Sequence, residues 1–549
     1  MLENMLDYVR IFLYVSLLIL GFLLFQAWQV EHPPVTIGQT QSSESATHFV
    51  PNTSVTTPVP MEKGTTPSDI PAPTKGQIVT VTTDRLQVAI DTQGGDLIQA
   101  KLLQYPESLG SKQPFLLLND NPKTRYIAES GLLSAIGPDT KTSQALYSVD
   151  QANYALAPNQ HDVVVNLHWQ KDGIQVIKRF IFTRGSYEVK VRYEISNQGN
   201  TAWEGNFYAQ LVRTNSPPET QSGLVNLTTF FGAAVSTPNK PFEKIAFKSM
   251  QDNPVNLTTK DGWAAMIQHY FITAWVPTDN TQTNYYSNVT ANGLYTIGLL
   301  GSKIVVPPNG QFNTEAKLYT GPTIGSELEK TASTLKLTID YGWFWFIAIA
   351  IFWLMQTIYD FIGNWGLSII LVTVFIKLLF YHLSAKSYRS MSALKRLQPR
   401  IELLRERYGD DKPKLTQSTL ELYRQEKVNP MSGCLPILIQ IPVFIALYWV
   451  LVESVQLRQA PFILWIHDLS QKDPYYILPI LMGISMFIQQ RLNPPPPDPL
   501  QAKVMLAMPL IFTILFKDFP AGLMLYWFVN NTLSFLQQWY VMRSINAKT

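Results

Sequence analysis

The chain has 549 residues, too many for one ordinary domain, and it is 46% hydrophobic but only 15% charged. Several apolar runs are long enough to cross a bilayer, so the composition excludes an ordinary soluble protein and indicates a polytopic membrane protein with a large soluble insert. The net charge of +3 says little as a total, while the single cysteine, Cys434, excludes a disulfide framework and a cysteine-based metal site.

Residues 1–30 contain the first apolar run, Ile11–Ala27. We predict an uncleaved transmembrane anchor, because the run continues into AWQVEHPP without the pair of small residues that a cleavage site requires. A cleaved signal peptide is the alternative. Residues 31–77 are rich in Thr and Ser, include eight prolines and have no apolar periodicity, which predicts a flexible linker.

Residues 78–322 show the alternation of β-strands. Apolar side chains occupy every second position of Tyr187–Ile195, and Val176–Phe182 precedes it across a turn that contains Gly185, so the two segments predict a hairpin. Val163–Trp169 alternates likewise. A region of this length and pattern predicts one large antiparallel β-sandwich.

Residues 323–360 combine a polar helix, predicted over Ser326–Leu337, with the apolar segment Tyr341–Tyr359. The apolar segment is long enough to span a membrane, but its three tryptophans are typical of the membrane–water interface. We therefore predict an interfacial amphipathic helix region, with a spanning helix as the alternative.

Residues 361–385 form the predicted second span and contain nearly all of the run NWGLSIILVTVFIKLLFYHLSAK, which begins at Asn364 and ends at Lys386. Lys377 lies about two turns before its basic end, where a charge costs about 2.5–3.5 kcal/mol on insertion scales. Two explanations remain open. The lysine snorkels to the interface, or it lies in a hydrated functional pocket.

Residues 386–428 are strongly basic, with eleven Lys/Arg against six Asp/Glu from Lys386 to Lys427. Apolar residues recur every three or four positions from Tyr388 to Tyr408, and Gly409–Pro413 interrupts this helical pattern. The pattern predicts a helical hairpin, which the positive-inside rule places in the cytoplasm. An alternative is that the charges act only as a topology signal and a solvated face.

Residues 429–542 contain the four remaining predicted spans, and residues 543–549 form a short tail. The spans are Gly433–Val455, Tyr475–Gln490, Val504–Phe516 and Ala521–Met542. Counting crossings from a cytoplasmic hairpin predicts six spans, both termini in the cytoplasm and the sandwich on the outer side. Several spans are short or contain proline, which suits a small bundle around a cavity.

Three runs in this part resemble the YidC family of membrane insertases, a branch of the Oxa-type insertases: NPMSGCLPILIQIPVFIALYWVL, LRQAPFILWIHDLSQKDPYYILPILMG and GLMLYWFVNNTLSFLQQ. The anchor, linker and sandwich resemble the Gram-negative bacterial form, so the resemblance covers nearly the whole chain. It implies a non-enzymatic insertase and chaperone that inserts and folds integral membrane proteins in the inner membrane, alone or with the Sec translocon.

The resemblance further implies five core helices around a hydrophilic groove, open to the cytoplasm and to lipid and closed towards the periplasm. It also implies a periplasmic supersandwich of the sugar-mutarotase type. The groove's positive residue matches Lys377, although many family members have arginine there. The matching groove positions are Lys377, Thr373, Gln440, Gln489, Tyr526 and Trp527. Alternatives remain open: hydrogen bonding between helices for Gln489, and an aromatic belt for Tyr526 and Trp527.

The partners implied are nascent integral membrane proteins, the Sec translocon with its accessory membrane subunits, the ribosome through the cytoplasmic hairpin, and the lipid bilayer. We expect no sequence-specific nucleic acid, no catalytic residue, no metal and no cofactor, because the chain has neither a HExxH pair nor a phosphate-binding glycine motif. The rival functions are a small-solute transporter or channel, and a sugar-processing enzyme built on the sandwich. The first requires a pathway open to both sides, and the second a carboxylate–histidine site in residues 78–322.

Overall fold

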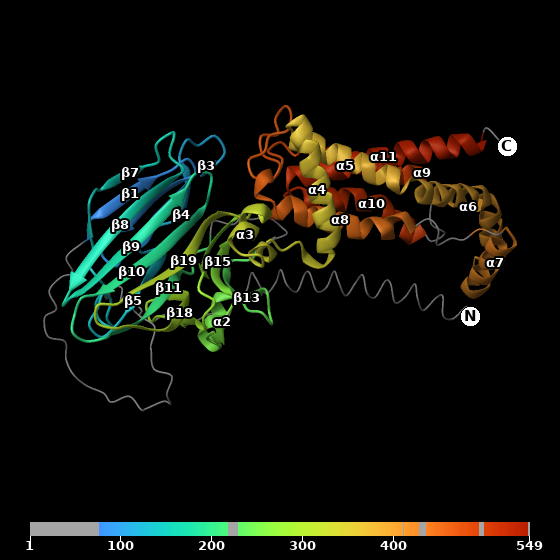
Figure 1. Ribbon diagram of the computed structural model, residues 1–549. Coiled ribbons are helices and arrows are strands. Elements are labelled where there is room, and N and C mark those ends of the chain that lie inside the picture. Colours follow the sequence, from blue (N-terminus) through green and yellow to red (C-terminus); the bar gives the residue numbers. More distant parts are fainter. Residues whose placement is uncertain are drawn as a thin grey trace. The chain divides into compact units, whose positions relative to one another are not determined.

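The computed structural model describes residues 76–217, 229–409, 411–426, 428, 435–493 and 499–546. The predicted anchor, nearly all of the predicted linker and the last three residues of the predicted tail lie outside these ranges. The described part comprises β-structure followed by helices (Figure 1).

The β-structure consists of two sheets. The first has the strand order β14 (Asn256–Thr259), β17 (Thr283–Val289), β18 (Leu294–Val306), β11 (Trp203–Thr214), β5 (Tyr126–Leu133), β3 (Asp96–Pro106), β2 (Leu86–Asp91), β1 (Ile78–Thr82) and β7 (Asn153–Ala155), with β4 (Pro114–Leu118) beside β3. The second has the order β13 (Glu243–Ile245), β12 (Gly232–Ser236), β15 (Trp263–Gln268), β16 (Phe271–Pro277), β19 (Gln311–Pro322), β10 (Glu188–Asn197), β9 (Ile174–Thr183), β8 (Asp162–Lys171) and β6 (Ser148–Val149).

The predicted hairpin is confirmed, because β9 and β10 pair antiparallel from Val189 opposite Phe182 to Asn197 opposite Ile174. Side chains alternate between buried and half-buried along both strands, as strands with one face on a core require. β8 pairs antiparallel with β9 in the same way. The described pairing departs from the expected purely antiparallel pattern where β1 and β7 run parallel and at a parallel bridge between Leu133 and Asp139.

The core lies between the two sheets and is rich in aromatic residues. Trp203, Trp263 and Trp275 are among the largest fully buried side chains. The indole nitrogen of Trp275 in the second sheet donates a 3.1 Å hydrogen bond to the Gln210 carbonyl in the first. Such bonds satisfy the polar edges of buried aromatics, so they fix how one sheet packs on the other.

The polar helix predicted over Ser326–Leu337 is wrong as one unbroken element. Helix α3 (Gly325–Thr331) ends early, and a 3-10 turn (Leu335–Thr338) follows it. The hydroxyl of Thr334 accepts a 2.9 Å hydrogen bond from the indole of Trp263. A threonine bonded to the sandwich favours a break in the helix at this point, since serine and threonine hydroxyls readily stabilise non-helical turns.

Helix α4 (Trp345–Ile362) follows a 3-10 turn (Gly342–Phe344). It packs against α5 and α8 and runs across the direction of α5 in Figure 1. Gly342 lies against the indole of Trp449, near the end of α8, whereas Tyr359 stacks on Trp365, the first residue of α5, at 4.3 Å. Both ends of α4 therefore contact the same end of the helical bundle.

Helices α5 (Trp365–Leu379) and α6 (Tyr381–Tyr408) meet at a bend of 66°. The second helix therefore begins inside the predicted span 361–385 and continues into the basic region. Helix α7 (Lys412–Gln425) completes the predicted hairpin, and the Asp411 side chain caps it by accepting a hydrogen bond from the amide of Lys414.

A separate short helix, α2 (Phe247–Asp252), belongs to the sandwich.

The remaining helices are α8 (Leu435–Glu453), α9 (Ile477–Leu492), α10 (Pro499–Phe516) and α11 (Ala521–Asn546). Helix α11 packs against α9, α5 and α6, and α10 packs against α9. Among the described residues, Gly342–Ile362 is the one unbroken helix with the length and hydropathy of a membrane crossing, and the bent pair α5–α6 meets the criteria together. α9, with 16 residues, is about 24 Å long, shorter than a typical hydrocarbon core.

Candidate functional site

Lys377 lies in the last turn of α5, and its side chain reaches towards α11. Its ammonium donates a 2.6 Å hydrogen bond to the hydroxyl of Ser534, which is only 3% exposed. The lysine also lines a small cavity of about 30 Å³ with Gln440, Asn530 and Ser384. A buried water needs roughly 10–15 Å³, so this space holds about two water molecules.

The charge on Lys377 has no acidic neighbour in the part of the chain that the structure describes. No carboxylate there lies within 4 Å of its nitrogen. A lysine ammonium has three donors, of which the Ser534 bond uses one. Within the described ranges no other hydrogen bond uses the remaining donors, so they can meet water or an incoming anionic group.

Thr373 lies one turn before Lys377 but does not line the cavity. It is 1% exposed, and its hydroxyl donates a 2.6 Å hydrogen bond to the Ile369 carbonyl of its own helix. Its polar atom is therefore already satisfied within α5.

Gln440 and Tyr526, both predicted groove residues, come together in the structure. The Gln440 side chain on α8 lies beside the hydroxyl of the buried Tyr526 on α11. Trp527 turns instead to a group of aromatic rings, with ring centroids 4.7 Å from both Phe444 and Phe516. One face of the site is thus polar and the adjoining one aromatic.

Gln489 lies on α9, half-buried, and it does not line the cavity around Lys377. Asn531 of α11 reaches α9 instead, where its amide donates a 3.3 Å hydrogen bond to the Ser485 hydroxyl. The structure therefore groups Lys377 with Gln440, places Tyr526 beside Gln440, and leaves Thr373 and Gln489 outside this group.

Sequence reasoning missed the serines of this site. Ser534 and Ser384 contact or line the Lys377 cavity, yet serine is common in apolar helices and neither stands out alone. A signal was available in α11, where polar residues recur with helical spacing through an otherwise apolar segment: Tyr526, Asn530, Ser534 and Gln538.

The loop between α8 and α9 closes one end of the bundle. Its Phe462 packs against Gly366 at the start of α5 and accepts a 3.2 Å hydrogen bond from the Asn364 side chain through its carbonyl. The fully buried Asp473 accepts bonds from the Trp465 indole and from the amide of Leu478 in α9. The loop is thus fastened to two helices at this end.

The same loop contacts the sandwich. The guanidinium of Arg458 donates hydrogen bonds of 2.8 and 3.0 Å to the carbonyls of Pro106 and Glu107, and it lies over the Phe115 ring. His269 of the sandwich bonds the Val452 carbonyl at 2.7 Å through Nε2. A carbonyl only accepts, so His269 carries a proton on Nε2.

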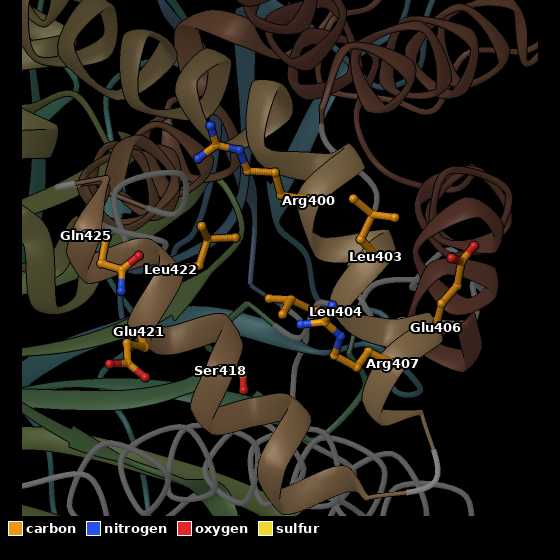
Figure 2. Close-up of a pocket in the computed structure, with 9 residues that line it drawn as sticks. All are labelled: Arg400, Leu403, Leu404, Glu406, Arg407, Ser418, Glu421, Leu422 and Gln425. Carbon is orange, nitrogen blue, oxygen red and sulfur yellow. The ribbon is translucent and has the colours of Figure 1, made fainter.

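The basic hairpin contains a groove of about 730 Å³ between α6 and α7. Figure 2 shows Leu404 and Leu422 between the two helices, while Glu406 points away from α7. Arg400 of α6 forms an ion pair with Glu426, just after α7. The groove thus has an apolar floor and a charged rim.

The sequence matches two families that together cover nearly all of the described chain. Residues 78–354 match the family described as YidC periplasmic domain, and residues 357–548 match the one described as 60Kd inner membrane protein.

Full-length relatives and one solved structure carry related names. The chain is 46% identical to the membrane protein insertase YidC of Hahella chejuensis, covering 98% of each chain, and 47% identical to that of Legionella pneumophila strain Corby, covering 98% of this chain and 97% of the relative. A crystal structure described as an active YidC insertase with the first transmembrane domain resolved is 18% identical. It covers 85% of this chain and 95% of its own, with a TM-score of 0.39.

The family assignment depends on the sequence matches, which extend over both the β-structure and the helices. The predicted resemblance is thereby confirmed. With nearly half of its residues identical to named insertases over almost its full length, this chain belongs to the YidC family of membrane protein insertases of the inner membrane.

Proposed function

We propose that this insertase draws the hydrophilic segments of nascent membrane proteins into a groove centred on Lys377. The observation that carries the proposal is the orientation of the lysine. Its ammonium bonds Ser534, 157 residues away on α11, and in the described structure no carboxylate neutralises it. A snorkelling lysine would instead extend along its own helix towards the interface.

The groove would act through the charge of Lys377 and by shortening the low-dielectric distance that a hydrophilic substrate segment must cross. Two opposite charges 4 Å apart attract by about 1 kcal/mol in water and by about 4 kcal/mol near a protein surface, so Lys377 holds an acidic segment weakly enough to release it. The apolar segment of the substrate then moves into lipid, driven by roughly 25 cal/mol per Å² of apolar surface transferred. Neither ATP nor a metal is required.

For the topology, we propose six spans, with both termini cytoplasmic and the sandwich in the periplasm. The spans are the anchor in residues 1–30, the second span in residues 361–385 and the four spans of residues 429–542. Helix α4 lies along the outer interface, a proposal supported by the contacts that both of its ends make with one end of the bundle. Its exposed tryptophans, Trp343 and Trp353, suit that position.

For the partners, we propose that the basic hairpin in residues 386–428 meets the ribosome and that the Sec translocon cooperates in insertion. Electrostatics supports the first contact, since the hairpin has five more basic than acidic residues from Lys386 to Lys427 and RNA is densely anionic. The groove in Figure 2 adds an apolar floor on the same element.

Site-specific photocrosslinking tests the groove. A photoreactive side chain at half-buried Trp527 should form adducts with ribosome-bound nascent membrane proteins. The matched control is Ile484 on α9, which is 51% exposed. Adducts at Trp527 that clearly exceed those at Ile484 support the proposal, whereas equal labelling or none at Trp527 contradicts it.

A further inference from the structure

We infer that Ser534 is a positioning residue that holds the Lys377 ammonium in the groove while leaving its charge unneutralised. The inference rests on the proposed role of Lys377 and adds a specific function for a serine on a different helix. Three observations support it: the geometry of the hydroxyl, the chemistry of its partners and the cavity beside it.

The hydrogen-bond geometry fixes the direction of each bond at Ser534. A lysine ammonium only donates, so the Ser534 oxygen accepts the 2.6 Å bond from Lys377. The serine therefore directs its own hydrogen to the Asn530 carbonyl, 2.7 Å away in the preceding turn. The Tyr388 side chain of α6 lies beside the Ser534 side chain. The two bonds use the one donor of the hydroxyl and one of its two acceptor sites.

These contacts join three helices at the bend in the chain. Lys377 precedes the junction of α5 and α6, Tyr388 follows it, and Ser534 lies on α11 opposite both. Tyr388 also packs with Ala385 and Val541, so the serine is held between packed side chains. The ammonium is consequently fixed towards α11 rather than free to extend to the interface.

If Lys377 is to attract acidic groups of a substrate, a neutral hydroxyl is a better partner for its ammonium than a carboxylate. An aspartate at this position would form an ion pair with Lys377 and occupy it, whereas a hydroxyl orients the ammonium and leaves its net charge at +1. The remaining donors are then available to the cavity lined by Gln440, Asn530 and Ser384. Ser534 therefore determines where an acidic group of the substrate meets the charge.

The experiment measures insertion of two forms of one single-span substrate in membrane vesicles. One form has an acidic translocated tail, and in the other the Asp and Glu of the tail are replaced by Asn and Gln. Ser534→Ala should reduce insertion of the acidic form about fivefold, the usual size of one lost hydrogen bond, and the neutral form much less. Ser534→Asp should reduce the acidic form roughly tenfold or more, and Ser534→Thr should restore at least half of it.

The matched control is Ser368→Ala, because Ser368 is a fully buried serine of α5 whose hydroxyl bonds only within its own helix, to the Asn364 carbonyl. It should affect both substrates equally and little. Equal losses for both substrates in Ser534→Ala, or no loss in either, would overturn the inference.

The Lys377→Gln variant separates this inference from the proposed function. If Lys377→Gln lowers both substrates equally, the proposed function fails. If Lys377→Gln selectively affects the acidic form while all three Ser534 variants behave as the wild type, the positioning role alone fails. Because Ser534→Asp introduces a charge, its expression and detergent-solubilised monodispersity must match those of the wild type. Should they not, Ser534→Ala and Ser534→Thr decide the question.

Discussion

Two lysines among the described residues, one fully buried and one half-buried, have opposite surroundings. Lys178 on β9 is 0% exposed, and its ammonium donates to the carbonyls of Gly94 and Ser130 at 3.0 and 2.7 Å. Three buried carboxylates, Asp96, Asp139 and Glu129, act on it electrostatically. Lys377 has one neutral hydroxyl and, among the described residues, no carboxylate.

The difference separates a structural charge from a functional one. Burial lowers the pKa of Lys178, and the nearby carboxylates oppose that shift by stabilising the ammonium. A charge surrounded in this way binds two sheets together and has little left to offer a ligand. Lys377 keeps both its charge and unused donors, which is the condition for attracting a passing anionic segment.

The largest expected effect is on Lys178. Lys178→Met leaves the three carboxylates without their cation, so we expect the free energy of unfolding of the sandwich to fall by about 3–5 kcal/mol. Thermal unfolding of the full chain in detergent, followed by circular dichroism, measures this. The control is Lys303→Met, which removes an exposed pair with Glu204 and should cost under about 1 kcal/mol. Similar losses in both variants would contradict a structural role for Lys178.

His269, a half-buried base of the sandwich, gives the next largest effect through pH. Burial lowers its pKa from 6.5 to about 4, an effect partly offset by the Val452 carbonyl that its ring bonds. Between pH 6.5 and 4 the unfolded chain binds a proton that the folded chain does not. The contribution of neutral His269 to the free energy of unfolding is therefore fully present above pH 6.5. It is lost as the pH falls through this window, by up to roughly 3 kcal/mol.

His269→Gln tests this dependence, since glutamine does not titrate and its amide can still donate to a carbonyl. Unfolding midpoints measured from pH 7.5 to 4.5 should decline less steeply in the variant than in the wild type. Parallel curves would show that His269 does not produce the loss.

A smaller change is expected for the stability of Lys377→Gln. In the wild type, Lys377 has only a neutral partner among the described residues. The substitution therefore removes the desolvation cost of the ammonium together with its charge. The free energy of unfolding should change by about 1 kcal/mol or less, against the several expected at Lys178. A loss as large as that of Lys178→Met would mean that both lysines are structural.

Local patterns predicted most of the fold, and contacts between distant segments account for the rest. The β9–β10 hairpin followed directly from alternation, because that pattern lies in one continuous segment from Ile174 to Asn197. The bend between α5 and α6 did not, because it depends on packing against α11, where the Gln537 side chain donates to the Tyr381 carbonyl. The predicted helix over Ser326–Leu337 was wrong for the same reason, since Thr334 bonds a tryptophan of the sandwich.

The candidate site shows the same division. Lys377 was found from the sequence because a charge in an apolar span is conspicuous. Gln440 and Tyr526 came from the family resemblance rather than from any pattern in the residues. Ser534 was missed because its importance arises only from a contact across 157 positions, although its spacing from Tyr526 and Asn530 placed it on the same stripe of α11.

The most direct measurement of the central claim compares wild type, Lys377→Arg and Lys377→Gln on substrates with acidic and neutralised tails. With a charge that attracts, Lys377→Gln lowers insertion of the acidic form about tenfold, equivalent to about 1.4 kcal/mol, and leaves the neutral form within about twofold. Lys377→Arg keeps the charge and should stay close to wild type on both. Equal losses for the two substrates in Lys377→Gln, or a loss in Lys377→Arg as large as that in Lys377→Gln, would contradict an electrostatic role for Lys377.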